Sequence, residues 1–165
     1  MGVDLPADAH AVETRSADRF ADFYRAAYPW AKRLAHLLLG GSADAEDVVQ
    51  DAFSHLHARF AGVLNANAYL RTSVVNGCRQ HHRGRVREDR RIRLVTDHGE
   101  RVVDVPDPLL DAVATLPLPQ RAALVLRYWA DLPDDEIAVA IGVRPATVRS
   151  LVHRGLASLR KEIDR

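Results

Sequence analysis

Apolar residues recur at spacings of three and four along most of the chain, which is the period of an amphipathic α-helix. The first stripe predicts a helix over 17–38, which Pro29 should kink or split because proline lacks an amide donor and clashes with the preceding turn. Gly40 and Gly41 predict its end, since glycine enters a left-handed C-cap without strain. The stripe consists of Phe20, Phe23, Tyr24, Ala27, Ala31, Leu34 and Leu38.

Two further helices are predicted over 43–60 and 68–87. Ser42 is the expected N-cap of the first of them, and acidic residues fill its first turn, where the helix dipole favours negative charge. This helix has an apolar face and, opposite to it, a polar and acidic one. The apolar face consists of Ala45, Val48, Val49, Ala52, Phe53, Leu56 and Phe60, and the polar face of Asp44, Asp47, Gln50, Asp51 and Ser54.

The charge of the chain is unevenly distributed, although the formal net charge is only +1. Eight arginines lie between Arg71 and Arg93, against the two acidic residues Glu88 and Asp89. The next segment is acidic and has no hydrophobic period, which predicts a linker. We therefore expect an all-α protein of two small helical domains joined by a flexible linker. The predicted parts are a disordered tail over 1–16, a first domain over 17–93, the linker over 94–108 and a second domain over 109–165.

The segment DDEIAVAIGVRPATVRSL, residues 134–151, has the outline of a helix-turn-helix. Asp134 is the expected cap of its first helix, Gly142 supplies the turn, and Pro145 begins the second helix, where a missing amide costs nothing. The expected inner stripe of the second helix is Val148, Val152, Leu156, Leu159 and Ile163. The residues expected to point outward are Arg144, Thr147, Arg149, Ser150, His153 and Arg154.

Arginines and small hydroxyl residues on an exposed helix suit the major groove of DNA, where arginine binds guanine edges or phosphates. The alternative is an ordinary helical bundle with a solvated basic face. The turn, the proline start and the basic face together favour DNA binding.

Other classes of protein have little support in the sequence. A single cysteine excludes an internal disulfide and a four-cysteine zinc site, and no signal peptide or membrane-length apolar segment is visible, so we expect a cytoplasmic protein. His55 and His57 should point about 200° apart on a helix, and Cys78 is more typical of a core. We expect no cofactor, no metal and no catalysis, with a metal-dependent enzyme or sensor as a remote alternative.

Two blocks of sequence resemble one family. SADAEDVVQDAFSHLHARF and NAYLRTSVVNGCRQHHRGR resemble region 2 of bacterial extracytoplasmic-function (ECF) sigma factors of the sigma-70 family, the domain that binds RNA polymerase and melts the promoter. LPLPQRAALVLRYWADLPDDEIAVAIGVRPATVRSLVHRGLASLR resembles their region 4, a helix-turn-helix domain. The resemblance implies a factor that binds core RNA polymerase, recognises promoter DNA and directs transcription initiation. A helix-turn-helix regulator with an unrelated N-terminal domain is the alternative.

The resemblance also implies site residues and partners. Asp47, Gln50 and Asp51 would bind the β′ clamp helices of the polymerase, unless they are simply a solvated acidic face. The minus-ten element, double-stranded and then melted, would be bound by Asn65, Asn67, Arg71, Asn76, Arg79 and Arg83. The helix-turn-helix residues Arg144, Thr147, Arg149, Ser150, His153 and Arg154 would read the minus-thirty-five element. The β flap of the polymerase and an anti-sigma factor are further expected partners.

Some of these assignments have competing explanations or depart from the family pattern. Asn65 and Asn67 are equally suited to turns and helix caps. The family usually has serine or threonine where this chain has Arg144, often a basic residue at Leu151, and commonly arginine at Val75. The acidic linker is expected either to shield the arginines of 79–93 from DNA or to be an inert spacer.

Overall fold

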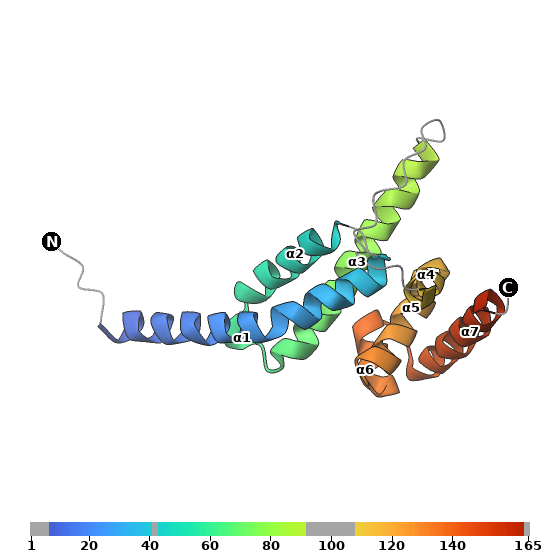
Figure 1. The fold of residues 1–165 in the computed structure, drawn as a ribbon. Helices are drawn as coiled ribbons and strands as arrows, with labels where there is room; N and C mark the ends of the chain where they lie inside the picture. The colour runs from blue at the N-terminus through green and yellow to red at the C-terminus, as the bar shows by residue number, and fades with distance from the viewer. Residues whose placement is uncertain (1–6, 41–42, 92–107, 164–165) are drawn as a thin grey trace.

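The computed structural model describes the backbone of residues 7–40, 43–91 and 108–163, and every regular element in these ranges is helical (Figure 1). This confirms the predicted all-α fold. The predicted linker falls almost entirely outside the described residues, and so does Ser42. The elements are α1 (Ala7–Leu39), α2 (Ala45–His57), the 3-10 helix η1 (Phe60–Gly62), α3 (Ala66–Arg91), α4 (Pro108–Thr115), α5 (Leu118–Leu124), the π-helix η2 (Val125–Trp129), α6 (Asp134–Ile141) and α7 (Pro145–Ile163).

The first helix is longer than its hydrophobic stripe. It begins at Ala7, so the predicted loose tail is wrong for 7–16, where alanine, glutamate and arginine favour helix without an apolar period. It also runs through Pro29 as a single helix of 33 residues instead of being split there. Ala27, Ala31 and Leu34 are buried on either side of the proline, and this packing keeps the chain helical despite the lost hydrogen bond.

The boundaries of the next two helices also differ from the prediction. The helix predicted over 43–60 ends at His57 and is followed by η1. The helix predicted over 68–87 extends over Ala66–Arg91. The side-chain oxygen of Asn65 accepts a hydrogen bond from the backbone amide of Ala68 at 2.9 Å, which caps α3 and explains its earlier start.

The first three helices pack around a core to which each contributes one apolar face. The predicted stripe of α2 is confirmed except at Phe60, which lies in η1 and is half-buried. Helices α2 and α3 approach closely at Gly77, where a Cβ atom would lie 2.7 Å from Cγ1 of Val48. Phe20, Phe23 and Tyr24 of α1 pack their rings against Phe53.

The second domain contains the predicted helix-turn-helix, with two local differences. Pro133, not Asp134, occupies the N-cap of α6, while Gly142 forms the turn in the left-handed conformation with φ 70°. The inner face of α7 includes Val148, Leu151 and Leu159, whereas Leu156, predicted to be inside, is 42% exposed. The stripe is displaced because Gly155 allows Leu124 to approach α7, so that a Cβ atom there would lie 2.8 Å from Leu124 Cδ1.

One buried hydrophobic cluster extends across both domains, whose helices lie side by side in Figure 1. Helix α6 packs against α3, and α1 packs against α4, α5 and η2. Leu126, Ile137 and Ile141 of the second domain belong to the same buried cluster as Leu38 and Val75 of the first. The sequence predicted two domains but not this contact between them.

Two glycines of α3 test the close packing of α2 on α3. A Cβ at Gly84 meets nothing within 4 Å, so Gly84→Ala should stabilise the protein by about 0.5–1 kcal/mol through helix propensity. Gly77→Ala gains the same propensity but must displace the stiff, β-branched Val48, at a cost of about 1–3 kcal/mol. We expect urea denaturation to show a lower free energy of unfolding for Gly77→Ala than for Gly84→Ala. Equal values for the two variants would contradict the packing described.

Candidate functional site

The outer face of α2 carries the three residues predicted to bind polymerase, and all three are exposed. They do not form one uniform surface. Gln50 donates a hydrogen bond from Nε2 to the hydroxyl of Tyr24 on α1 at 3.3 Å. Asp47 and Asp51 instead line a groove of about 450 Å³ between α2 and α3. The rest of the groove is formed by Asp44, Val48, Ala52, His55, Tyr69, Ser73, Asn76, Gly77, Gln80 and His81.

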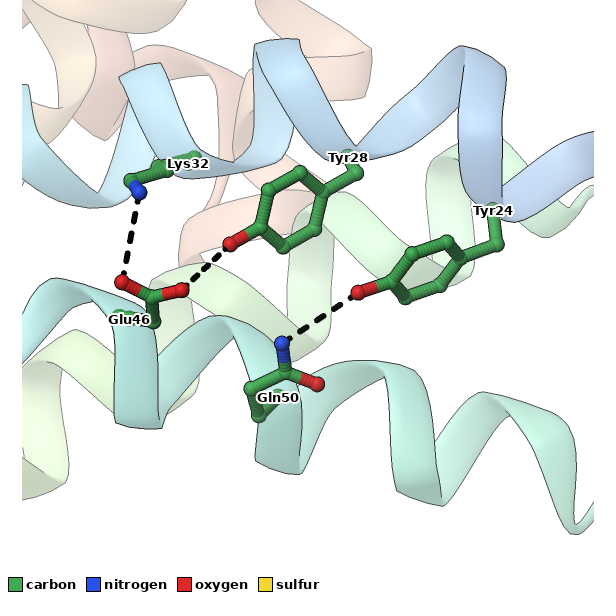
Figure 2. Close-up of polar contacts among 5 residues, drawn as sticks. All are labelled: Tyr24, Tyr28, Lys32, Glu46 and Gln50. Carbon is green, nitrogen blue, oxygen red and sulfur yellow. Dashed lines mark hydrogen bonds and ion pairs between the residues drawn. The ribbon is translucent and has the colours of Figure 1, made fainter.

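Figure 2 shows the polar contacts that join α1 to α2. Tyr28 donates a hydrogen bond to Glu46 at 2.7 Å, and Lys32 lies 3.3 Å from the same carboxylate. These contacts hold the pKa of Glu46 below its usual value, first through the Tyr28 hydroxyl and then through Lys32. Glu46 is therefore paired within the domain, whereas Asp47 and Asp51 lie on the outer face of α2 and line the groove together with Asp44.

The six residues predicted to bind the minus-ten element do not lie on one open surface. Asn76 lines the acidic groove beside Asp47, whereas Asn67 and Arg71 line a separate cavity of about 330 Å³ between the domains. The other residues of this cavity are Trp30, Leu34, Leu126, Trp129 and Ala130. Arg83 is exposed on α3. Asn65 uses its side-chain oxygen to cap α3, which is the alternative that the sequence left open.

Arg71 and Arg79 are partly buried because the second domain covers them. Arg71 forms an ion pair with Glu136 of α6 at 3.1 Å. Arg79 donates a hydrogen bond from Nη1 to the carbonyl oxygen of Ile141 at 2.8 Å. Both arginines are therefore bound to the helix-turn-helix domain of the same chain, an arrangement that no sequence motif signalled.

Five of the six residues predicted to read the minus-thirty-five element are exposed, and Thr147 is half-buried. Arg149 lies 3.5 Å from Asp134, which also forms an ion pair with Arg127. Asp134 thus lies beside Arg149, which is predicted to contact DNA, instead of capping its helix. Leu151, where the family often has a basic residue, is 6% exposed and belongs to the core. Arg144 directly precedes α7, and its carbonyl oxygen accepts hydrogen bonds from the amides of Thr147 and Val148.

Within residues 7–40, 43–91 and 108–163, no group of three or more histidine, cysteine, aspartate or glutamate side chains is arranged to hold a metal ion. Cys78 is buried in the first domain, and burial raises the pKa of its thiol to about 12. None of the helices described is long and apolar enough to cross a membrane.

Comparisons with known proteins match both the first and the second domain to sigma-70 regions. The family model for sigma-70 region 2 matches residues 23–88, and the model for sigma-70 region 4 matches residues 107–159. The RNA polymerase sigma-E factor of Streptomyces antibioticus is 33% identical over 139 residues, which cover 77% of this chain and 74% of that protein. The protein of the same name from Streptomyces avermitilis is 30% identical over 157 residues, which cover 88% and 85%.

Two solved structures have a similar fold. One is RpoE of Bartonella quintana, in complex with the anti-sigma factor NepR, with a TM-score of 0.74 and 22% identity. The match covers 88% of this chain and 97% of that chain. Another is CnrH, in complex with the cytosolic domain of CnrY, with a TM-score of 0.63, 18% identity and coverage of 88% and 87%.

The role of Asn65 as a helix cap can be tested by removing or retaining its side-chain oxygen. Asn65→Ala removes the acceptor for the Ala68 amide and should lower the free energy of unfolding by about 0.5–2 kcal/mol. Asn65→Ser retains a capping oxygen and should stay close to the wild type. Thermal unfolding followed by circular dichroism measures both. The cap assignment fails if serine proves as destabilising as alanine.

Proposed function

We propose which surface of this chain binds the polymerase and which surfaces bind each promoter element. The chain belongs to the ECF group of the sigma-70 family. As a sigma factor it binds core RNA polymerase, recognises promoter DNA and directs transcription initiation. Because residues 23–88 match sigma-70 region 2, a sigma factor is favoured over a helix-turn-helix regulator with an unrelated N-terminal domain. The observation that carries this assignment is the separation of charge between the exposed acidic face of α2 and the basic residues of α3 and α7.

The outer face of α2 is the proposed docking surface for the β′ clamp helices of the polymerase. Asp47 and Asp51 supply exposed negative charge, and their neighbour Glu46 is already paired with Lys32. The hydrogen bond from Gln50 to Tyr24 fixes the amide that we assign to the same surface. A basic partner would be steered to this face by complementary charge.

Helix α3 and the loop before it are proposed to bind the minus-ten element. Asn67 is exposed and has both donors and acceptors for the edge of an unstacked base, whereas the side-chain oxygen of Asn65 is occupied by the cap. Arg71, Arg79 and Arg83 would hold the phosphate backbone or neighbouring bases. Among the six residues assigned to this element, Asn76 has the least support for DNA binding, because it lines the acidic groove.

Helix α7 is proposed to read the minus-thirty-five element in the major groove. Arg144 and Arg149 lie near its beginning, and both are exposed. His153 and Arg154 lie farther along the helix, where Arg154 suits a phosphate contact. Ser150 and the half-buried Thr147 complete the surface.

The proposed role is non-catalytic and cytoplasmic, and the β flap of the polymerase is a further proposed partner. An anti-sigma factor is also proposed, because the solved RpoE of similar fold was determined with one. The buried cluster shared by the two domains supports this partner. A protein that stabilises the contact between the domains would keep them from separating to bind the two promoter elements.

Charge reversal on α2 tests the docking surface. Asp47→Lys combined with Asp51→Lys should abolish binding to core polymerase, because reversed charges oppose the steered contact. Asp18→Lys combined with Asp22→Lys is the matched control, with the same charge change at the same spacing on exposed positions of α1. Size-exclusion chromatography with core polymerase measures complex formation. Equal binding by the two double variants would remove α2 from the interface.

Substitution of Arg149 tests the reading helix. Arg149→Ala should weaken the binding of the holoenzyme to its promoter by about 1–3 kcal/mol if this side chain contacts a base edge. Arg160→Ala, exposed near the end of the same helix, is the control and should have little effect. Filter binding on a promoter identified by run-off transcription gives both affinities. The orientation assigned to α7 is wrong if Arg149→Ala binds as well as Arg160→Ala.

A further inference from the structure

One carboxylate in the helix-turn-helix domain contacts two arginines at once. Asp134 is the first residue of α6, and its side chain is 24% exposed. Its Oδ1 forms an ion pair with Nη2 of Arg127, which lies in η2. Its Oδ2 lies 3.5 Å from Nη1 of Arg149, which lies on α7. Each oxygen of the carboxylate therefore contacts a different helix, and the three side chains connect η2, α6 and α7.

The two arginines differ in their exposure to water. The side chain of Arg127 is 32% exposed, whereas that of Arg149 is 67% exposed. Charges that are partly buried are screened by water and salt less than exposed ones. The ion pair of Asp134 with Arg127 is therefore the stronger of the two contacts, and it holds the carboxylate in place beside Arg149.

The backbone before α6 also holds Asp134 in this position. Pro133, the N-cap of α6, has an extended conformation with φ −71° and ψ 161°. The amide of Leu132 donates a hydrogen bond to the carbonyl oxygen of Leu126 at 3.1 Å, which ties this turn to η2. The positive end of the α6 dipole favours a carboxylate in its first turn. The position of Asp134 is thus determined by its own helix, by the turn and by Arg127.

The contact with Asp134 leaves most of the Arg149 guanidinium available. It involves Nη1, and a guanidinium has further N–H donors in a planar fork. These donors suit O6 and N7 of guanine in the major groove. A long arginine side chain loses rotamer freedom when it binds. A fixed carboxylate beside Arg149 restricts its rotamers before DNA binds, which lowers that cost.

A carboxylate close to a DNA-binding helix also has a cost. It repels phosphates, and this repulsion weakens binding to every sequence alike. Its benefit must therefore be greater discrimination between bases, because specificity is a difference between affinities.

We propose that Asp134 is a positioning residue, which orients Arg149 toward one base of the minus-thirty-five element, and that Arg127 holds Asp134 in place. Guanine is the base whose acceptors match the fork of Arg149. Asp134 acts through Arg149 and does not itself bind DNA. The proposal deepens the function proposed for α7 and rests on it, since Arg149 must contact a base edge.

An isosteric substitution tests the positioning. Asp134→Asn removes the negative charge and keeps the size of the side chain. The control is Asp135→Asn, which removes the same charge from an exposed neighbour on α6. Fluorescence anisotropy measures binding of each holoenzyme to a labelled duplex promoter identified by run-off transcription. The same measurement is made on duplexes with single base-pair substitutions across the minus-thirty-five element.

Discrimination at one position is the Kd for the substituted duplex divided by the Kd for the original promoter. We expect Arg149→Ala to lose discrimination at one position of the element. At that position Asp134→Asn should discriminate about three- to tenfold less than Asp135→Asn, and at the other positions the two should be equal. In the Arg149→Ala background, Asp134→Asn should cause no further loss.

The outcomes separate this proposal from the function on which it rests. Equal discrimination by Asp134→Asn and Asp135→Asn would overturn the positioning. An equal loss of affinity at every position, together with a lower unfolding temperature, would show that Asp134 only stabilises the domain. The function proposed for α7 fails separately, if Arg149→Ala retains full discrimination at every position.

A second variant decides the question if Asp134→Asn does not fold. Arg127→Gln removes the ion pair that holds the carboxylate but retains the carboxylate itself. It should lower discrimination at the same position as Asp134→Asn, by a smaller factor. Full discrimination by a folded Arg127→Gln variant would contradict the role of Arg127 and, in the absence of a folded Asp134→Asn variant, the proposal as a whole.

Discussion

Two arginines, one from each domain, cap helices of the other domain, and the relative placement of the two domains depends on them. Arg79 of the first domain binds the last carbonyl of α6, and Arg121 of the second binds the carbonyl of Leu38 near the end of α1. The final carbonyls of a helix have no partner within the helix and carry the negative end of its dipole. Each arginine supplies donors and positive charge at such an end. Burial lowers the pKa of Arg121, the cost expected for a guanidinium that has carbonyls instead of a carboxylate as its partners.

This reciprocal capping accompanies a difference in exposure among the proposed surfaces. Helix α6 packs on α3 beside arginines assigned to the minus-ten element, while the acidic face of α2 and the residues of α7 assigned to the minus-thirty-five element are largely exposed. The interface has a buried apolar centre and a polar edge, where Glu136 is about half exposed. A partner that offers the arginines of α3 a better set of hydrogen-bond acceptors can displace α6. The phosphates of a DNA backbone are such acceptors.

The hydrophobic pattern predicted the helices well but not their ends or their mutual placement. The stripe of α2 and the turn at Gly142 could be read from the chain, because local period and glycine conformation are properties of short segments. The start of α1 at Ala7 was missed, since helix propensity without an apolar stripe leaves no pattern. Leu156 was misplaced because the exposed side of α7 depends on how closely Leu124 approaches Gly155.

The candidate sites were also predicted only in part from the sequence. Exposure of Asp47, Asp51 and Arg149 followed from their place opposite the apolar stripes. The ion pair of Arg71 with Glu136 joins residues that are 65 positions apart, and the cap at Leu38 joins residues 83 apart. No periodicity connects such pairs, so their contact could come only from the folded chain. Gly40 and Gly142 were expected as helix ends, but not as the places where an arginine of the other domain approaches.

The distance between the domains tests the central claim most directly. Spin labels at Ala61→Cys and Ser158→Cys, both exposed, place one label in each domain, while the buried Cys78 is shielded from the reagent. Double electron–electron resonance on the free chain should give one narrow distance distribution, which becomes longer when core polymerase is added. A broad distribution in the free chain that polymerase leaves unchanged would contradict a closed state held by the two arginine caps.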